Sequence, residues 1–207
     1  MAQLTRIDDG SLTQFALFPG GLTISVGSVP AVVGDIICVF VGQVGAATAV
    51  AVTDSEGHTY TQSSLFVSPT VADTRAAAAY TVATAEGPLT VTATFTGSPG
   101  TVYEMAVAVL RGTVLAYRFT GAGQYFSTPS RTVNAPGITQ SADTDYFGGA
   151  MSSAGAPHNA VITLPDGSTV PYVSPSDRMD FYTGAVVGIA AGGIQIQREA
   201  GAESASW

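Results

Sequence analysis

The sequence predicts an all-β protein, an antiparallel β-sandwich of the jelly-roll-like kind, and three observations support that prediction. Apolar and polar residues alternate with a period of two along much of the chain, β-branched residues are abundant, and Gly or Pro interrupts the runs at short intervals. No window of about twelve residues carries a helical apolar stripe between helix caps. Many short strands separated by such turns are typical of a sandwich or barrel.

The clearest strand is predicted at residues 89–96. Leu89, Val91, Ala93 and Phe95 fall on one side of it, and the intervening positions are all threonine. A strand with one apolar and one hydroxyl face lies with one face in a core and the other in water. We therefore expect Phe95 to point into the core; residues 194–197 repeat the alternation on a smaller scale.

Three other runs are almost entirely apolar, at residues 35–41, 103–110 and 181–190. Continuous apolar runs of this length indicate strands covered on both faces. Glu104 interrupts the second run, and we interpret it as pointing outward on a half-exposed strand; the alternative is a buried carboxylate paired with an arginine. Turn residues with fixed or positive φ separate the runs, notably Gly20-Gly21, residues 54–57, Pro99-Gly100, Pro136-Gly137 and residues 165–167.

The domain organisation follows from a weak internal duplication. Residues 34–112 and 143–207 present similar strands and turns in the same order. Two such halves share one core in a jelly roll, so we predict a single domain over residues 21–207. Residues 1–20 are expected to form an N-terminal arm or a first strand.

Composition excludes two partner classes. Charged residues make up 11% of the chain, lysine is absent, and the formal net charge is -8 with a pI near 4.4. Such a molecule repels phosphate backbones and anionic lipid, so neither nucleic acid nor a membrane is an expected partner. A weakly charged, Ser- and Thr-rich surface suits contact with other protein subunits, because hydroxyl groups cost less to desolvate than ammonium groups.

The N-terminus lacks the basic and apolar segments of a secretion signal, and no apolar run approaches the ~20 residues of a membrane span. Cys38, the one cysteine, lies within an apolar run and is predicted to be a buried small hydrophobe. No internal disulfide can form, which fits assembly in a reducing cytoplasm.

No motif for catalysis, cofactor binding or metal binding is apparent. His58 and His158 lie far apart in sequence without neighbouring ligands at zinc spacing, and we expect His58 to be solvated in its turn. Asp143 and Asp145 are interpreted as residues at a strand entrance rather than a glycosidase pair. The Asp-rich turns lack a calcium-ligand ladder, so turn formation accounts for them. We predict no enzyme activity.

Three aromatic residues are candidate partner contacts. Tyr125 and Phe126 follow a glycine-rich loop, and Trp207 is the last residue given. Exposed aromatic side chains dominate the energetics of many interfaces. The alternative for Tyr125 and Phe126 is that they fill a gap in the core, and Trp207 either closes its own subunit or reaches a neighbour.

A set of turn and strand motifs, none of them a catalytic signature, resembles a known group of proteins. The set comprises Gly34-Asp35 before an apolar strand, residues 53–61, Ala79-Tyr80, the threonine-alternating strand and residues 102–110. Together these resemble β-sandwich modules of tailed-phage virion accessory proteins and bacterial surface proteins, closely over residues 22–112 and loosely beyond. The resemblance implies capsid decoration, a head or tail fibre, or a sugar-binding accessory role, and it carries no functional residues over.

We therefore expect a non-enzymatic virion structural protein, a capsid decoration protein or a head spike or fibre, made in the host cytoplasm. The alternative is a carbohydrate- or receptor-binding module of a tail or cell-surface protein. Expected partners are the major capsid protein or other virion subunits, with a surface glycan as a further candidate. Decoration proteins bind repeated lattices as symmetric oligomers, so we expect a homo-oligomer, a trimer, with one or both chain ends in the contact.

Overall fold

The computed structural model describes residues 5–8, 12–17, 20–67, 74–112, 132–134, 144–152, 160–163, 169–170, 179–186, 195–198 and 205–206. All regular secondary structure in these ranges is β-strand. Within the same ranges there is no helix with the length and apolar character needed to span a membrane.

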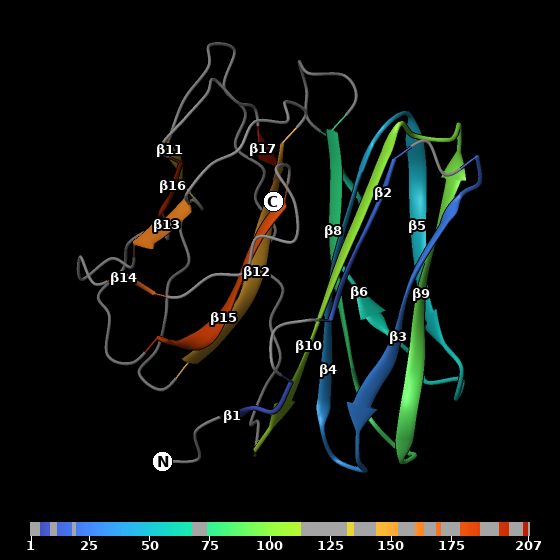
Figure 1. Cartoon of the computed structure of the whole chain (residues 1–207), viewed down its shortest axis with the longest axis vertical. Helices are drawn as coiled ribbons and strands as arrows, with labels where there is room; N and C mark the ends of the chain where they lie inside the picture. The colour runs from blue at the N-terminus through green and yellow to red at the C-terminus, as the bar shows by residue number, and fades with distance from the viewer. Residues whose placement is uncertain are drawn as a thin grey trace.

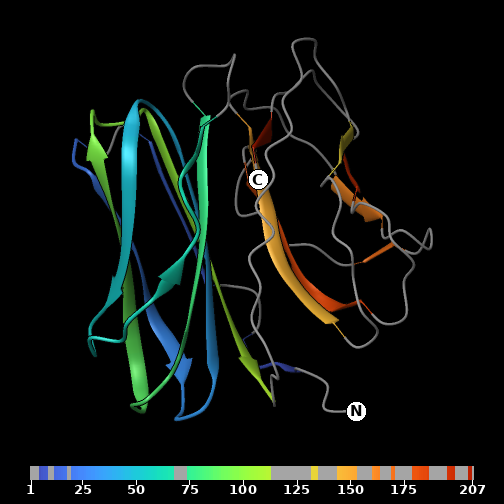
Figure 2. The same ribbon diagram turned by 180° about the vertical axis from the view of Figure 1, so that it is seen from behind.

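Two antiparallel sheets form the sandwich (Figures 1 and 2). The strands of the larger sheet are β1 (Thr5–Arg6), β2 (Thr13–Leu17), β4 (Ile36–Val44), β6 (Thr61–Gln62), β7 (Phe66–Val67), β8 (Thr74–Val82) and β10 (Val102–Arg111). Their order is β1-β10-β4-β8-β6, and in addition β2 pairs with β10 and β7 pairs with β8. The smaller has the order β3-β9-β5, with β3 (Thr23–Ala31), β9 (Gly87–Gly97) and β5 (Ala47–Asp54).

The long strands alternate between the two sheets along the chain. From β2 to β5 and from β8 to β10, each crosses to the opposite sheet from the one before it. The facing orders β2-β10-β4-β8 and β3-β9-β5 are those of a jelly roll that lacks one strand of the smaller sheet. The predicted all-β antiparallel sandwich is confirmed.

The remaining described strands form two further sheets. One has the order β11-β16-β13-β14 and the other β15-β12-β17; the bounds are β11 (Thr132–Asn134), β12 (Thr144–Ser152), β13 (Ala160–Thr163), β14 (Thr169–Val170), β15 (Met179–Val186), β16 (Gln195–Arg198) and β17 (Ala205–Ser206). The strands of the sandwich therefore all come from residues 5–111. The domain boundaries at residues 21–207 and the duplication stay predictions.

The N-terminal residues that the structure describes form an edge of the larger sheet. Both β1 and β2 pair with β10, and between them the Asp8 carboxylate accepts a hydrogen bond from the Val109 amide at 2.8 Å. The Leu12 carbonyl accepts another from the Val107 amide. The described residues 5–8 and 12–17 thus run along β10, and the extent of an arm or first strand over residues 1–20 stays a prediction.

The main core lies between the two sheets. Leu89, Val91, Ala93 and Phe95 of β9 point into it, while the threonines of β9 lie on the other face. Phe95 is 1% exposed and meets Tyr103 of β10 edge-on, with ring centroids 5.0 Å apart. The predicted register of this strand is confirmed.

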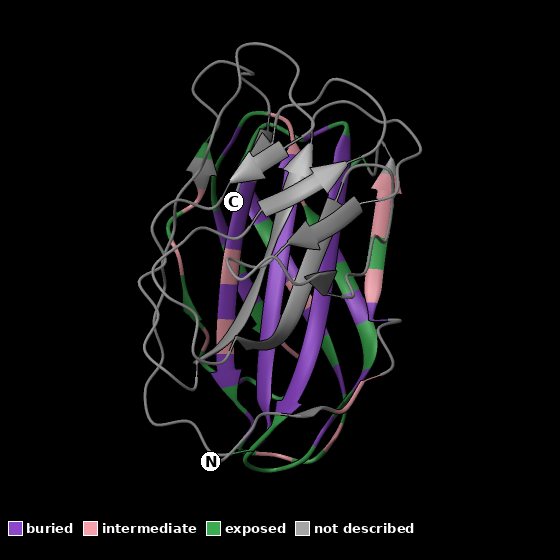
Figure 3. Ribbon diagram, turned by 90° about the vertical axis from the view of Figure 1, so that its left-hand side faces the viewer, coloured by how far each residue is buried: buried purple, intermediate pink, exposed green. Residues whose placement is uncertain are grey.

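The central strands of the larger sheet are buried on both faces (Figure 3). On the face away from the main core, Phe40 of β4 packs with Ala76, Val102 and Ala106. That face is turned toward β12, which lies against β4 and β8 (Figures 1 and 2). The prediction that residues 35–41 and 103–110 are covered on both sides is confirmed.

Glu104 is a correction to the sequence analysis. Its side chain is fully buried, and alternation along β10 places it on the same face as Val102 and Ala106. The outward interpretation assumed that this face of β10 meets water. It fails because this face of β10 is covered, as its apolar neighbours Val102 and Ala106 show; the single charged residue was given more weight than the apolar run around it.

Candidate functional site

The richest group of polar side chains lies where β5 ends, in the turn after Asp54. One carboxylate oxygen of Asp54 accepts hydrogen bonds from the amides of Glu56 at 3.0 Å and His58 at 3.2 Å. Gly57 has a φ of 76°, a conformation that side chains other than glycine rarely adopt. Asp54 and Gly57 thus supply the turn chemistry that the sequence predicted.

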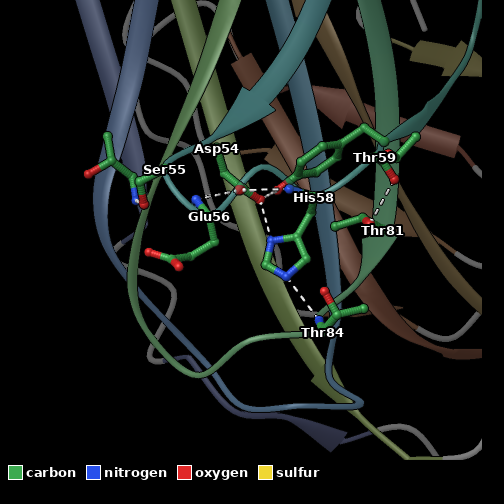
Figure 4. A network of polar contacts seen from close by, with 9 residues as sticks. Asp54, Ser55, Glu56, His58, Thr59, Thr81 and Thr84 are labelled. Atoms are coloured by element: carbon green, nitrogen blue, oxygen red, sulfur yellow. Dashed lines mark hydrogen bonds and ion pairs between the residues drawn. The ribbon is translucent and has the colours of Figure 1, made fainter.

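The other carboxylate oxygen of Asp54 holds two side chains (Figure 4). It lies 2.9 Å from His58 Nδ1 and accepts a hydrogen bond from the Tyr60 hydroxyl at 2.9 Å. On the far side of the imidazole, Nε2 accepts a hydrogen bond of 2.9 Å from the Thr84 amide. The side chain of His58 is 2% exposed and that of Asp54 is fully buried.

These contacts determine where the proton of a neutral His58 ring resides. Nε2 accepts from a backbone N–H and must carry a lone pair, so Nδ1 carries the proton and donates it to Asp54. Both ring nitrogens are therefore occupied. In this arrangement the imidazole has no lone pair free for a metal ion or for a substrate proton. The expectation that His58 is solvated is wrong, because the turn folds the ring inward against the loop after β8.

The charges of the group follow from the same contacts. Burial raises the pKa of Asp54, but hydrogen bonds from Tyr60 and from the amide and ring of His58 outweigh it and hold the pKa below its ordinary value. Burial, and then the adjacent Asp54 carboxylate, raise the pKa of Tyr60 far above its ordinary value. Asp54 is thus an anion and Tyr60 a neutral donor across the physiological range.

The polar contacts continue along this end of the sandwich. Next to Thr84, the Ala83 amide donates to the Asp35 carbonyl at 2.8 Å, and the Ala83 carbonyl accepts from Gly34. The Asp35 carboxylate, almost fully buried, receives Arg111 Nε at 2.8 Å and Nη2 at 2.9 Å in a two-pronged ion pair. These residues form one connected series of polar contacts, which we call the corner network: Asp54, His58, Tyr60, Thr84, Ala83, Asp35 and Arg111.

The corner network joins four separate segments of the chain. These are the turn after β5, the loop after β8, the turn after β3 and the end of β10. Ser55 adds a link to β9, since its amide donates to the Thr90 carbonyl and its hydroxyl accepts from the Thr90 amide. The arrangement is a brace: it fixes the relative positions of turns that belong to both sheets.

A second buried polar group lies toward the other end of the sandwich. Gln43 Nε2 donates to the Tyr103 hydroxyl at 3.2 Å and to the Ser98 carbonyl at 3.3 Å, and the Tyr103 hydroxyl accepts from the Gly100 amide at 2.7 Å. The Gln43 side chain packs so closely on Gly100 that a Cβ there would lie 2.5 Å from Gln43 Cγ. This group also holds turns together.

The outer face of the smaller sheet has a different character. Its exposed positions are mainly threonine, serine and alanine, and none of the exposed residues of β3, β9 and β5 is charged. Thr92 pairs with Ser25 on one side and Thr53 on the other, and Thr94 with Thr23 and Ala51. We call this surface the threonine face; it points away from β12 and β15 (Figures 1 and 2).

The free edge of this sheet at β5 is partly closed by a side chain. The Gln62 carboxamide donates to the Val50 carbonyl at 2.8 Å and accepts from the Val52 amide at 3.2 Å. It takes the hydrogen bonds that a further strand would make at these two residues. Side-chain capping of this kind protects an edge from pairing with another chain.

Several residues singled out from the sequence lie outside the described part of the chain. They are the candidate partner contacts Tyr125, Phe126 and Trp207, together with His158 and Asp143. Asp145 lies in β12. Cys38 is buried, as predicted, and burial followed by the nearby Asp8 charge raises its pKa to about 12. Among the described residues, no group of three or more His, Cys, Asp or Glu residues is placed to hold a metal ion.

Sequence reasoning missed the corner network. A local signal existed for one part of it, because Asp54, His58 and Tyr60 fall within a single turn. No local sequence signal existed for the contact of Thr84 with His58. None existed for the ion pair of Asp35 with Arg111 either, because the two residues lie 76 positions apart in the sequence.

Comparisons with protein-family models, with curated proteins and with solved structures found no match to this chain.

Proposed function

We propose that this chain is a non-enzymatic structural protein that packs against other protein subunits. The observation that carries the proposal is the threonine face, a sheet surface whose exposed strand residues are all uncharged, on a molecule whose formal net charge is -8. Covering hydroxyl and methyl groups costs far less than covering unpaired charges. A neighbouring subunit can therefore approach this face without desolvating charges.

The internal use of polar side chains supports the same proposal. Asp54, His58 and Asp35, which in another setting could perform acid–base chemistry, make their hydrogen bonds to turns and strand ends of the sandwich itself. Such bonds tie loops to a rigid scaffold. Rigid turns suit a protein whose role is to hold a fixed shape within an assembly.

The particular assembly we propose is the virion of a tailed bacteriophage, in which the chain is a capsid decoration protein or a head spike or fibre. The support is the resemblance of residues 22–112 to sandwich modules of phage accessory proteins, together with the jelly-roll order of the strands β2 to β10, which include these residues. In this proposal the partner is the major capsid protein or another virion subunit, and the chain acts as a homo-oligomer, a trimer.

Purified particles of the phage that encodes this chain test the proposal. Immunogold electron microscopy should place an antibody against the chain on the heads in a regular pattern. Absence of the chain from purified particles would overturn the virion role. Label confined to tail tips, with binding of the purified chain to host glycans, would instead favour a receptor-binding module.

A pair of variants tests the contact surface itself. Thr94→Asp places a charge at the centre of the threonine face and should weaken particle binding by at least about tenfold, since an interfacial charge must be desolvated. Thr61→Asp is the matched control, because Thr61 is an equally exposed threonine on the larger sheet. Equal binding by both variants would contradict the assignment of the threonine face.

A further inference from the structure

The contacts of His58 are made by one protonation state of its ring. Its two nitrogens face opposite partners: Nδ1 faces the Asp54 carboxylate at 2.9 Å, and Nε2 faces the Thr84 amide at 2.9 Å. The carboxylate can only accept a hydrogen bond, and the amide can only donate one. A second proton on the ring therefore strengthens one contact and cannot be accommodated in the other.

We propose that His58 is a pH-sensitive latch: protonation of Nε2 opens the contact to Thr84 while the contact to Asp54 stays closed. Two N–H groups cannot point at each other across a hydrogen-bond distance, so the ring and the Thr84 amide must separate. The ring stays in place because the imidazolium and the Asp54 carboxylate form a charge-assisted pair. The loop after β8 is the part that moves.

The exposed position of Thr84 keeps the energetic cost of that movement low. His58 is buried, with its backbone held by Asp54, whereas Thr84 is exposed and its amide can turn to water. The adjoining Ala83 stays tied to Asp35 and Gly34 by two backbone hydrogen bonds. The latch thus separates the turn after β5 from the loop after β8 without requiring either sheet to open.

Other titratable and charged groups lie on the turn of His58 and on the neighbouring elements of this end of the sandwich. They are Asp54, Glu56 and Tyr60 of its own turn, Glu86 in the loop after β8, Asp35 in the turn after β3, Arg111 at the end of β10 and Cys38 of β4. The pKa values of Asp54 and Asp35 are lowered, and those of Tyr60, Cys38 and Arg111 are raised. These five groups therefore each keep one protonation state between about pH 5 and 8.

Hydrogen exchange of the intact chain, followed by NMR between pH 8 and pH 5, tests the latch. The readout is the protection factor of each amide, which removes the intrinsic pH dependence of exchange. Thr84 should lose about tenfold protection on acidification, consistent with loss of one hydrogen bond. The amides of Glu56 and His58, both bonded to Asp54, should retain theirs. An unchanged Thr84 amide, or equal loss at all three, would overturn the proposal.

Two variants separate the latch from other acid effects, including any from His158, which both retain. His58→Gln keeps a neutral acceptor near the position of Nε2, so Thr84 should stay protected at both pH values. His58→Asn keeps a donor near Nδ1 but loses the acceptor, so Thr84 should be unprotected at both. A pH-dependent loss in His58→Gln as large as in the parent protein would overturn the proposal.

The ring nitrogens of the parent protein give a measurement that needs no variant to fold. Their ¹⁵N shifts should report Nδ1–H with a bare Nε2 at pH 8. Both nitrogens should be protonated at low pH, and the change should coincide with the shift of the Thr84 amide. A proton on Nε2 at pH 8 would contradict the latch directly.

Discussion

Strands β9 and β4 occupy the middle of the two sheets, yet their outer faces meet different surroundings. Along β9, buried apolar residues alternate with threonines on the threonine face. Along β4, every residue from Ile36 to Gln43 is buried, because the larger sheet is covered both by the smaller sheet and on the side of β12. One strand thus separates a core from water, and the other separates two apolar layers.

This difference predicts opposite tolerance of charge. Phe40→Asp places a carboxylate among Ala76, Val102 and Ala106 and should cost more than about 4 to 5 kcal/mol, or prevent folding, because the charge is buried without a partner. Thr94→Asp, at a matching place on β9, should cost under about 1 kcal/mol. Urea denaturation of both variants measures the comparison. A small loss for Phe40→Asp would mean that this face of β4 is open to water.

The next largest loss of stability is expected from a change on the apolar side of β9. Phe95→Ala should lower the free energy of unfolding by about 3 to 5 kcal/mol, through lost burial and the cavity left beside Tyr103. The neighbouring Thr96→Ala, which changes an exposed position on the same strand, is the control. Chemical denaturation checks the pair. A loss below about 1 kcal/mol for Phe95→Ala would contradict the register of β9.

A smaller effect is expected where a side chain packs on bare backbone. Gly100→Ala sets a Cβ 2.5 Å from Gln43 Cγ and 2.6 Å from the Val44 carbonyl oxygen, and should cost about 1 to 3 kcal/mol through overpacking. Gly27→Ala is the control, because the nearest atom to its added Cβ is Thr90 Oγ1 at 3.9 Å. Thermal unfolding of both variants should lower the Tm for Gly100→Ala alone. Equal shifts would mean that the Gln43 group can rearrange.

The mildest effect concerns the corner network in acid. Hydrogen bonds from Arg111 lower the pKa of Asp35, which outweighs the effect of its burial. Because the folded-state pKa lies below the unfolded value of 3.8, the stabilisation is complete above about pH 4 and is lost as the pH falls through the folded-state pKa. The parent protein should therefore lose more stability between pH 5 and pH 2 than Asp35→Asn does. Equal acid sensitivity in urea titrations would contradict a linked Asp35–Arg111 pair.

Sequence pattern was a sound guide where the determinant was local. The alternation at residues 89–96 predicted both the strand and the inward position of Phe95. The almost entirely apolar runs at 35–41 and 103–110 predicted burial on two sides. Asp54 and Gly57 predicted a turn, because a carboxylate that accepts nearby amides and a residue free to adopt positive φ act within a few residues.

Errors arose where a residue's surroundings come from distant parts of the chain. His58 was expected to be solvated, and it is buried because the loop after β8 supplies the Thr84 amide. Glu104 was expected to face outward, and it is buried because the outer side of β10 is covered. The candidate contacts Tyr125, Phe126 and Trp207 lie outside the described residues and stay predictions.

The sequence by itself determined the class of fold, the register of β9 and the weakly charged surface, since periodicity and composition are properties of the chain. Only the tertiary structure decided which strands lie against the outer face of the larger sheet, which turns the corner network joins and which nitrogen of His58 carries the proton. The physical reason is that a hydrogen bond or an ion pair such as Asp35–Arg111 joins atoms that the fold brings together, and neither partner leaves a mark in the sequence around the other.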